Sequence, residues 1–292
     1  MRPPAPLLVL LAVPLSLGAQ DGGTGAPPGA DTEDGSRVDF APGELLYPDY
    51  VADPRRPTFG FALLDVGDAE IPEAGDTRYV VRMGARFGIL RVERAGGSPL
   101  WQLDGNMGFL AQFDRERSTD SLGWDGLYGL DLTVPAGERT VLQLGLSHDS
   151  AHLGDEYIEQ TGTERIDYTR QELNLGARYR LVADWSAYAE YGYGFDLRNE
   201  DLQEPGRAQG GLEGEFDLPL NGLRGYTALN LDAYEEDGWD LNSALQLGVR
   251  PRSAAGGAVW RFGLELYDGR SPMGELFQHD EAWIALGFSV DP

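Results

Sequence analysis

The sequence predicts an all-β fold, an antiparallel up-and-down transmembrane β-barrel of about twelve strands. From Phe59 onward, apolar residues recur at every second position, which is the period of a strand with two different faces. The alternating runs reach about ten residues, whereas strands of soluble proteins average about five or six. Short links alternate along the chain with longer or more acidic ones, as they do in outer-membrane barrels.

The run from Tyr79 to Ile89 shows the alternation clearly, because one face is apolar and the other holds Arg82, Arg86 and two glycines. Opposed charges on the polar faces could pair across a narrow lumen more readily than they could cover a solvated exterior. Trp and Tyr near the ends of the apolar faces also favour a membrane barrel over a soluble barrel or sandwich. Further runs cover 101–109, 124–134, 173–181, 185–195, 241–249, 260–266 and 282–290, with weaker ones at 208–217 and 225–235.

The links predict the orientation of the barrel. An even number of strands places both termini in the periplasm, with short turns there and long loops outside. The weak first run, Phe59 to Asp65, makes the count even, so ten or eleven crossings remain an alternative. The short links are 94–98, 135–139, 182–184, 218–223 and 251–257, and the long ones are 66–77, 115–121, 150–167, 198–207 and 268–278, with 236–239 a short outer exception.

The N-terminus reads as a secretory signal peptide over residues 1–19, with Arg2, an apolar run from Leu7 to Leu17, and a small-residue cleavage site. Residues 20–44 are rich in Gly, Pro, Asp and Thr and predict a disordered leader. The barrel then occupies 45–292. Its first stretch, to Pro57, is expected to be an ordered approach to the first strand whose prolines forbid a regular helix. We expect export to the outer membrane of a Gram-negative bacterium, with both termini periplasmic.

Composition excludes several function classes. The chain has no cysteine, so disulfides and thiol catalysis are excluded. Its 48 acidic and 23 basic residues give a formal net charge of −25, which argues against nucleic-acid binding. No phosphate loop or dinucleotide fingerprint occurs between a strand and a helix, so no nucleotide cofactor is expected. Outer-membrane lipids are the partners that this fold predicts.

The segment Ser147 to Tyr157 concentrates residue types that carry chemistry. The leucines at 142, 144 and 146 face lipid, so parity continues that face to His148 and Ser150 and turns Ser147 and Asp149 toward the lumen. A His-x-Ser pair on one strand face lies close enough to share a hydrogen bond, and His could then deprotonate Ser. The third, orienting group would come from the next strand, where the candidates of matching parity are Asp167, Thr169 and Gln171.

This lipid-facing pair resembles the arrangement in outer-membrane phospholipase A and the lipid A deacylases, whose barrels present a His-x-Ser pair to the membrane. The resemblance covers two residues and a barrel. It implies an acyl-ester hydrolase acting on lipid, with His148 and Ser150 as the catalytic pair. From the candidates of matching parity on the next strand, we take Asp167 as the third catalytic residue.

Other interpretations of the segment stay open. His148 and Ser150 could be polar residues at the membrane interface, with Gly154, Asp155 and Glu156 in an ordinary acidic loop. A metal site from His148, His152, Asp155 and Glu156 is a further alternative, although a spacing of four unites two histidines on a helix and this region predicts strand and loop. Calcium could bind through Asp155 and Glu156. His279 has no evident partner and is expected at the surface.

The wider segment also resembles the signature of a bacterial family of unknown function predicted to be outer-membrane proteins. The shared residues are Ser147 to Tyr157, a Leu46-Tyr47 pair followed by 52–57, Asp104-Gly105, and Gln112-Phe113-Asp114. The resemblance extends over residues 45 to 290 and implies the fold but no activity.

A diffusion channel competes with the enzyme. About twelve strands enclose little free space once Arg, Glu, Gln and Tyr side chains enter the lumen. A narrow lumen is therefore expected in place of a wide pore, and a structural or adhesive role for the outer loops remains open.

Overall fold

The computed structural model describes residues 30–31, 35–199, 201–252 and 257–292. The predicted signal peptide and most of the predicted leader lie outside these residues. No helix within the described ranges is both long and apolar enough to span a membrane.

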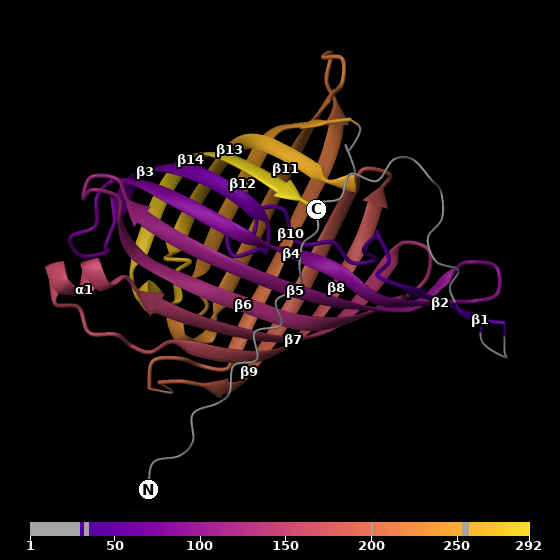
Figure 1. Ribbon diagram of the computed structural model, residues 1–292, viewed down its shortest axis with the longest axis horizontal. Coiled ribbons are helices and arrows are strands. Elements are labelled where there is room, and N and C mark those ends of the chain that lie inside the picture. The colour runs from indigo at the N-terminus through magenta and orange to yellow at the C-terminus, as the bar shows by residue number, and fades with distance from the viewer. Residues whose placement is uncertain (1–29, 32–34, 200, 253–256) are drawn as a thin grey trace, which may run out of the picture.

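Twelve antiparallel strands form a closed up-and-down barrel, as the alternation predicted. Each strand from β3 to β14 pairs with the next, and β14 pairs with β3 to close the ring (Figure 1). The strands are β3 (Phe59–Ala69), β4 (Thr77–Glu93), β5 (Pro99–Asp114), β6 (Asp120–Pro135), β7 (Thr140–Leu153), β8 (Thr169–Val182), β9 (Trp185–Leu197), β10 (Gly206–Asp217), β11 (Leu223–Tyr234), β12 (Leu241–Pro251), β13 (Val259–Arg270) and β14 (Asp280–Asp291).

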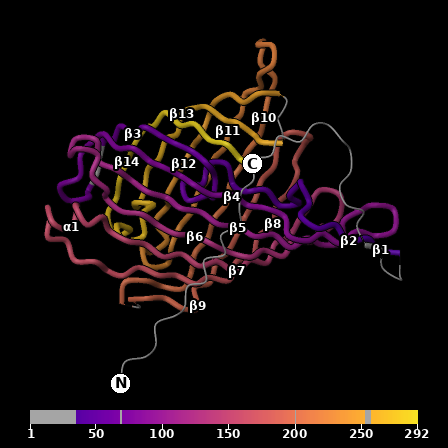
Figure 2. Tube along the Cα trace, in the orientation of Figure 1, coloured from indigo at the N-terminus to yellow at the C-terminus, as the bar shows by residue number. Residues whose placement is uncertain are grey.

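The two ends of the barrel differ. The helix α1 (Asp155–Thr161) and the short 3-10 helices η1 (Glu235–Asp237) and η3 (Gly274–Leu276) belong to connections at one end, which we call the loop end. Strand β3 begins and β14 finishes at the other, the turn end. The small strands β1 (Ala30–Asp31) and β2 (Arg37–Phe40) lie beyond this turn end, opposite α1 (Figure 2).

Side-chain parity divides apolar from charged residues as expected. The outward face carries large exposed side chains such as Leu144 and Leu175, while Arg78 and Asp104 on the inward face are fully buried. The weak first run is strand β3, and the two Gly-rich or mixed runs are β10 and β11. An apolar exterior around a charged interior is the reverse of a soluble barrel.

The chain between β2 and β3 runs through the inside of the barrel. Strand β2 pairs with the turn-end residues of β4, from Leu90 to Glu93, and β3 pairs with β4 only from Thr77 to Arg82. Residues 41–58 leave the sheet between these two pairings and contact lumen-facing side chains of several strands. We call residues 41–58 the lumen segment.

Glycines on the inward faces make room for this segment. A Cβ added at Gly84 would lie 3.2 Å from the Cα of Pro57, and one added at Gly176 would lie 2.8 Å from the Tyr47 hydroxyl. Tyr47 is fully buried, and the ring of Tyr50 stacks on Tyr188 with centroids 3.8 Å apart. The glycine positions are therefore required by close approach of the segment.

The expected ordered approach to the first strand is irregular, but it lies within the lumen. Its prolines prevent a regular helix, and its polar side chains find partners on the barrel wall. Residues 37–40, placed in the predicted leader, form β2 on the edge of β4. The alternation of apolar and polar residues within a strand predicts neither the entry of this segment into the lumen nor the pairing of β2 with β4.

The connection between β13 and β14 also folds inward. Its residues from Ser271 to Phe277 are buried, and the Glu275 carboxylate accepts hydrogen bonds from the backbone N–H groups of Ile166 and Tyr168. This connection, one of the links expected to be a long outer loop, instead covers the loop end of the lumen.

Gly84→Ala should lower the free energy of unfolding by about 1–3 kcal/mol, because overpacking displaces neighbours that cannot yield. The added Cβ would lie 2.5 Å from the backbone oxygen of Met107. Gly67→Ala is the matched control, since its Cβ would meet nothing within 4 Å. Denaturant unfolding of the barrel in detergent measures both, and equal stability of the two variants would contradict the packing argument.

Candidate functional site

Strand β7 presents the predicted site on two faces. Ser147 faces the lumen, where its Oγ accepts a hydrogen bond of 2.9 Å from Asn174 Nδ2, and the inward Asp149 carboxylate pairs with Arg55. His148 and Ser150 alternate with these residues and lie on the outward face, together with His152. The parity predicted for the segment thus agrees with the observed strand, which continues to Leu153.

Aromatic residues of β6 pack against both outward histidines. The His148 ring stacks on Tyr128 with centroids 4.5 Å apart, and the His152 ring lies 4.2 Å from that of Trp124. A spacing of four is even, so a strand also carries both histidines on one face, contrary to the expectation that only a helix unites them. They lie about 13 Å apart along the strand, too far to share one metal ion.

Ser150 occupies the gap between these two stacked pairs. Its neighbour on β6 is Gly126, which has no side chain to cover it. On β8, Thr169 pairs in register with Ser150, and Gln171 pairs with His148. The outward wall therefore brings His148, Ser150 and Gln171 together, although no hydrogen bond joins His148 to Ser150 in the described chain.

The predicted third residue, Asp167, is engaged elsewhere. Its carboxylate is 2.8 Å from Arg198 in an exposed ion pair, and no hydrogen bond links it to His148 among the residues that the structure describes. Gln171 instead donates a 2.5 Å hydrogen bond to Asp196 on β9. Of the candidates of matching parity, Gln171 is thus the one placed beside the histidine.

The second half of the motif forms a helix, where strand and loop were expected. A Cβ at Gly154 would lie 1.9 Å from the Ser121 carbonyl oxygen, so only glycine fits where β7 passes into α1. The Tyr157 hydroxyl donates a 2.8 Å hydrogen bond to the Pro72 carbonyl oxygen, and burial raises the pKa of this tyrosine. The motif therefore anchors α1 to neighbouring loops.

The acidic pair of the motif lies in the first turn of α1. Asp155 and Glu156 are exposed there. Among the described residues, no group of three or more His, Cys, Asp or Glu side chains is arranged to hold a metal ion. Calcium binding by this pair stays a prediction. His279, expected at the surface, is half-buried, and its backbone N–H donates to the Leu276 carbonyl oxygen.

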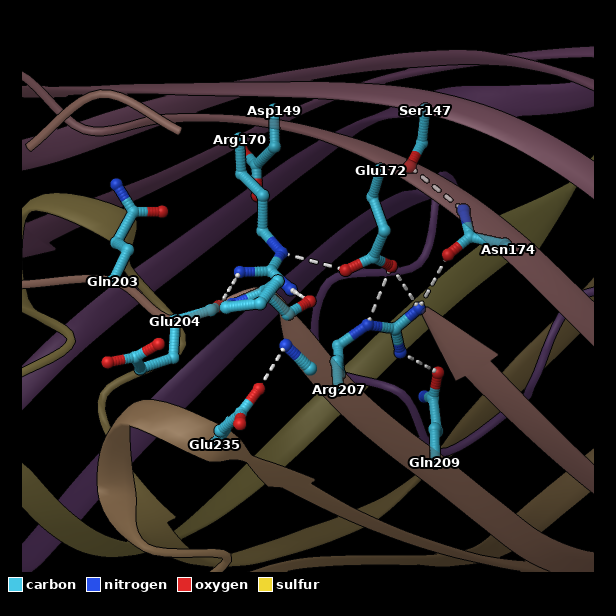
Figure 3. A network of polar contacts seen from close by, with 12 residues as sticks. Ser147, Asp149, Arg170, Glu172, Asn174, Gln203, Glu204, Arg207, Gln209 and Glu235 are labelled. Atoms are coloured by element: carbon cyan, nitrogen blue, oxygen red, sulfur yellow. Dashed lines mark hydrogen bonds and ion pairs between the residues drawn. The ribbon is translucent and has the colours of Figure 1, made fainter. Parts of the chain in front are cut away.

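Inside the barrel, Glu172 joins two arginines (Figure 3). Its carboxylate oxygens lie 2.7 Å from Arg170 Nε and 2.7 Å from Arg207 Nη2. Arg207 continues the network to Glu190 at 2.5 Å. The charges of these two arginines and two glutamates are thus compensated by one another on the neighbouring strands β8, β9 and β10.

Arg55 joins three parts of the molecule at one point. Its Nη1 lies 2.8 Å from an Asp125 oxygen on β6, and its guanidinium also contacts Asp149 on β7 and the Pro272 carbonyl oxygen. The same Asp125 oxygen accepts a 2.9 Å hydrogen bond from the backbone N–H of Gly274. We call this contact between lumen segment, wall and inward connection the Arg55 junction.

A cavity of about 200 Å³ adjoins the Arg55 junction. Arg270 is held there between Tyr234 and Phe277, with its guanidinium 3.9 Å and 4.5 Å from the two ring centroids. Sequence reasoning missed this lumen site because its partners are far apart in the chain. The only available signal was the pair of adjacent arginines after Pro54, in a stretch otherwise rich in proline.

Residues 37–291 match a protein-family model described as "Protein of unknown function (DUF1207)". The chain belongs to this family. The membership confirms the resemblance drawn from the Ser147 to Tyr157 motif, and the family description states no activity. No curated protein matches the chain in sequence.

The fold is similar to that of solved outer-membrane barrels. Outer membrane phospholipase A from Escherichia coli is 10% identical and superposes with a TM-score of 0.56, over 81% of this chain and 93% of that one. The Salmonella typhi phospholipase, a dimer with bound calcium, is 11% identical with a TM-score of 0.53, over 84% and 94%. At these identities the likeness shows the fold alone, that of an outer-membrane-type barrel.

Glu172→Gln should destabilise the barrel by about 3–5 kcal/mol, because it leaves buried arginine charge uncompensated. Asp167→Asn is the control: it removes one exposed carboxylate and keeps a residue that tolerates a left-handed backbone, φ 59° here. Loss of that exposed ion pair should lower the free energy of unfolding by about 0–1 kcal/mol. Unfolding in detergent compares the two, and a smaller effect at Glu172 than at Asp167 would refute the argument.

Proposed function

We propose that the chain is a sealed outer-membrane barrel with a narrow lumen, whose interactions take place on its surface. The observation that carries this proposal is the lumen segment, which fills the interior that a porin leaves open. Tyr47 and Arg56 of the segment are buried, and Arg55 binds the wall and the inward connection together.

The apolar exterior supports placement in a membrane. Outward residues such as Phe61, Leu146 and Leu286 are exposed and would contact lipid. Short turns belong on the periplasmic side of such barrels and long connections on the outside. The turn end would therefore face the periplasm with both termini, and α1 would face the exterior.

The wild-type protein should show no steady ion conductance in planar lipid bilayers, because the lumen segment blocks diffusion. A general porin, reconstituted at the same protein-to-lipid ratio, serves as the positive control. Insertion is verified by protease protection and by co-flotation with the vesicles. Stable unitary conductance steps from the verified, folded wild type would overturn the proposal.

A second candidate function is acyl-ester hydrolysis of membrane lipid. The specific observation in its favour is the group of His148, Ser150 and Gln171 on the outward wall, next to the loop end. Polar residues facing lipid are costly unless they bind water, headgroups or each other. A glycine opposite Ser150 leaves its hydroxyl open to an approaching ester.

The chemistry would follow the usual course of a serine hydrolase. After a rotation of its ring toward Ser150, His148 takes the hydroxyl proton while Oγ attacks the ester carbonyl carbon. The alcohol leaves with that proton, and water, deprotonated by His148, then releases the fatty acid. Gln171 would orient the imidazole, and its bond to Asp196 would hold the amide in place.

Ser150→Ala and His148→Ala should each lower the rate of fatty-acid release by about 10²- to 10⁴-fold, because each removes the nucleophile or its base. Ser147→Ala is the matched control, since this serine faces the lumen. Phospholipid and lipid A are assayed in mixed micelles, with calcium and with a chelator. Equal rates in all four proteins, or no release by any of them, would exclude the hydrolase.

A further inference from the structure

The contacts of the barrel wall do not cross the lumen. Ion pairs between described barrel residues join strands that lie near one another around the ring. The widest connects Arg82 on β4 to Glu265 on β13 at 3.0 Å, with only β3 and β14 between those strands. Arg178 on β8 pairs with Glu213 on β10, and Arg207 on β10 pairs with Glu172 on β8. The wall network follows the circumference.

The lumen segment, in contrast, connects opposite parts of the wall. Tyr50 donates a 2.9 Å hydrogen bond to Glu190 on β9, while Arg56 lies 2.9 Å from Asp291 on β14. Asp49 reaches Arg86 on β4, and Arg55 reaches β6 and β7. The segment therefore occupies the centre of the barrel, and the wall charges are largely compensated without it.

From this arrangement we infer that the barrel is a latent channel, closed by the lumen segment and opened when the Arg55 junction breaks. The inference goes beyond the proposed resting state, which is sealed. The segment is not part of the wall: its displacement removes no strand pairing from the ring of β3 to β14, which closes by itself.

The charges left behind identify the class of solute. Asp125 and Asp149 have Arg55 as their cationic partner, and the described chain offers neither of them a second arginine. Asp49 would also leave, but its partner Arg86 keeps Asp104 and Asp131 on the wall. An opened lumen would thus expose unpaired carboxylates near the loop end and favour small cations over anions.

The test compares conductance and ion preference in planar bilayers for two variants that break the junction from opposite sides. Arg55→Gln/Arg56→Gln removes the cations of the segment, Arg56 being the partner of Asp291, and Asp125→Asn/Asp149→Asn removes the two wall partners of Arg55. Both should show unitary conductance steps that are absent from the wild type, because each leaves buried charge unpaired at the junction. Only the arginine variant should prefer K⁺ to Cl⁻ in a KCl gradient, since only it keeps the carboxylates.

A disulfide supplies the closing control. A Cβ added at Gly108 would lie 3.3 Å from the Cβ of Pro57, close to the separation of about 3.5–4.5 Å in disulfides, and the chain has no cysteine of its own. Pro57→Cys/Gly108→Cys, added to the arginine variant, should abolish conductance when oxidised and restore it on reduction.

If neither junction variant conducts ions, although heat-modifiable gel mobility verifies that both are folded, the inference is overturned. The inward connection alone would then seal the lumen. Conductance that persists in the oxidised disulfide variant would also overturn it, since the leak would then run elsewhere. If one junction variant fails to fold, the other decides the question. Conductance of the wild type itself would instead refute the sealed resting state, so the two failures are distinguishable.

Discussion

Arginines inside the barrel can remain charged there only because carboxylates on nearby strands compensate them. A lone buried charge would cost several kcal/mol, so each inward arginine constrains which residues its neighbours carry. The wall satisfies this constraint around its circumference, as Arg86 does with Asp104 and Asp131. The wall pairs do not reach the centre of the lumen. The lumen segment fills that centre and brings arginines, carboxylates and tyrosines of its own.

One strand links the interior to the outward wall. On β7, Asp149 points inward to Arg55, while its neighbours His148 and Ser150 point outward. The position of the lumen segment and the position of the proposed nucleophile therefore depend on the same stretch of backbone. A barrel without a filled lumen would hold this outward face on a less constrained strand.

Strand parity made the barrel wall and the facing of its side chains predictable, because alternation is a local property of the sequence. It placed His148 and Ser150 outward and Ser147 inward, and it gave the closed barrel of β3 to β14. It could not reveal the lumen segment, since the contact between Arg55 and Asp125 joins residues far apart in sequence. Asp167 had the correct parity but is turned to Arg198 by a left-handed backbone, and α1 follows Gly154, whose close contact with Ser121 is tertiary.

The attachment of the lumen segment at both of its ends constrains how the segment can move. Strand β2 holds one end against β4, and β3 holds the other end against the same strand. A segment held at both ends can move into or out of the lumen only as a loop. Its two ends stay at the turn end, where β3 begins and β14 finishes. A displaced segment would therefore remain tethered beside the opening of the barrel, and its return to the lumen would be an intramolecular step that does not depend on protein concentration.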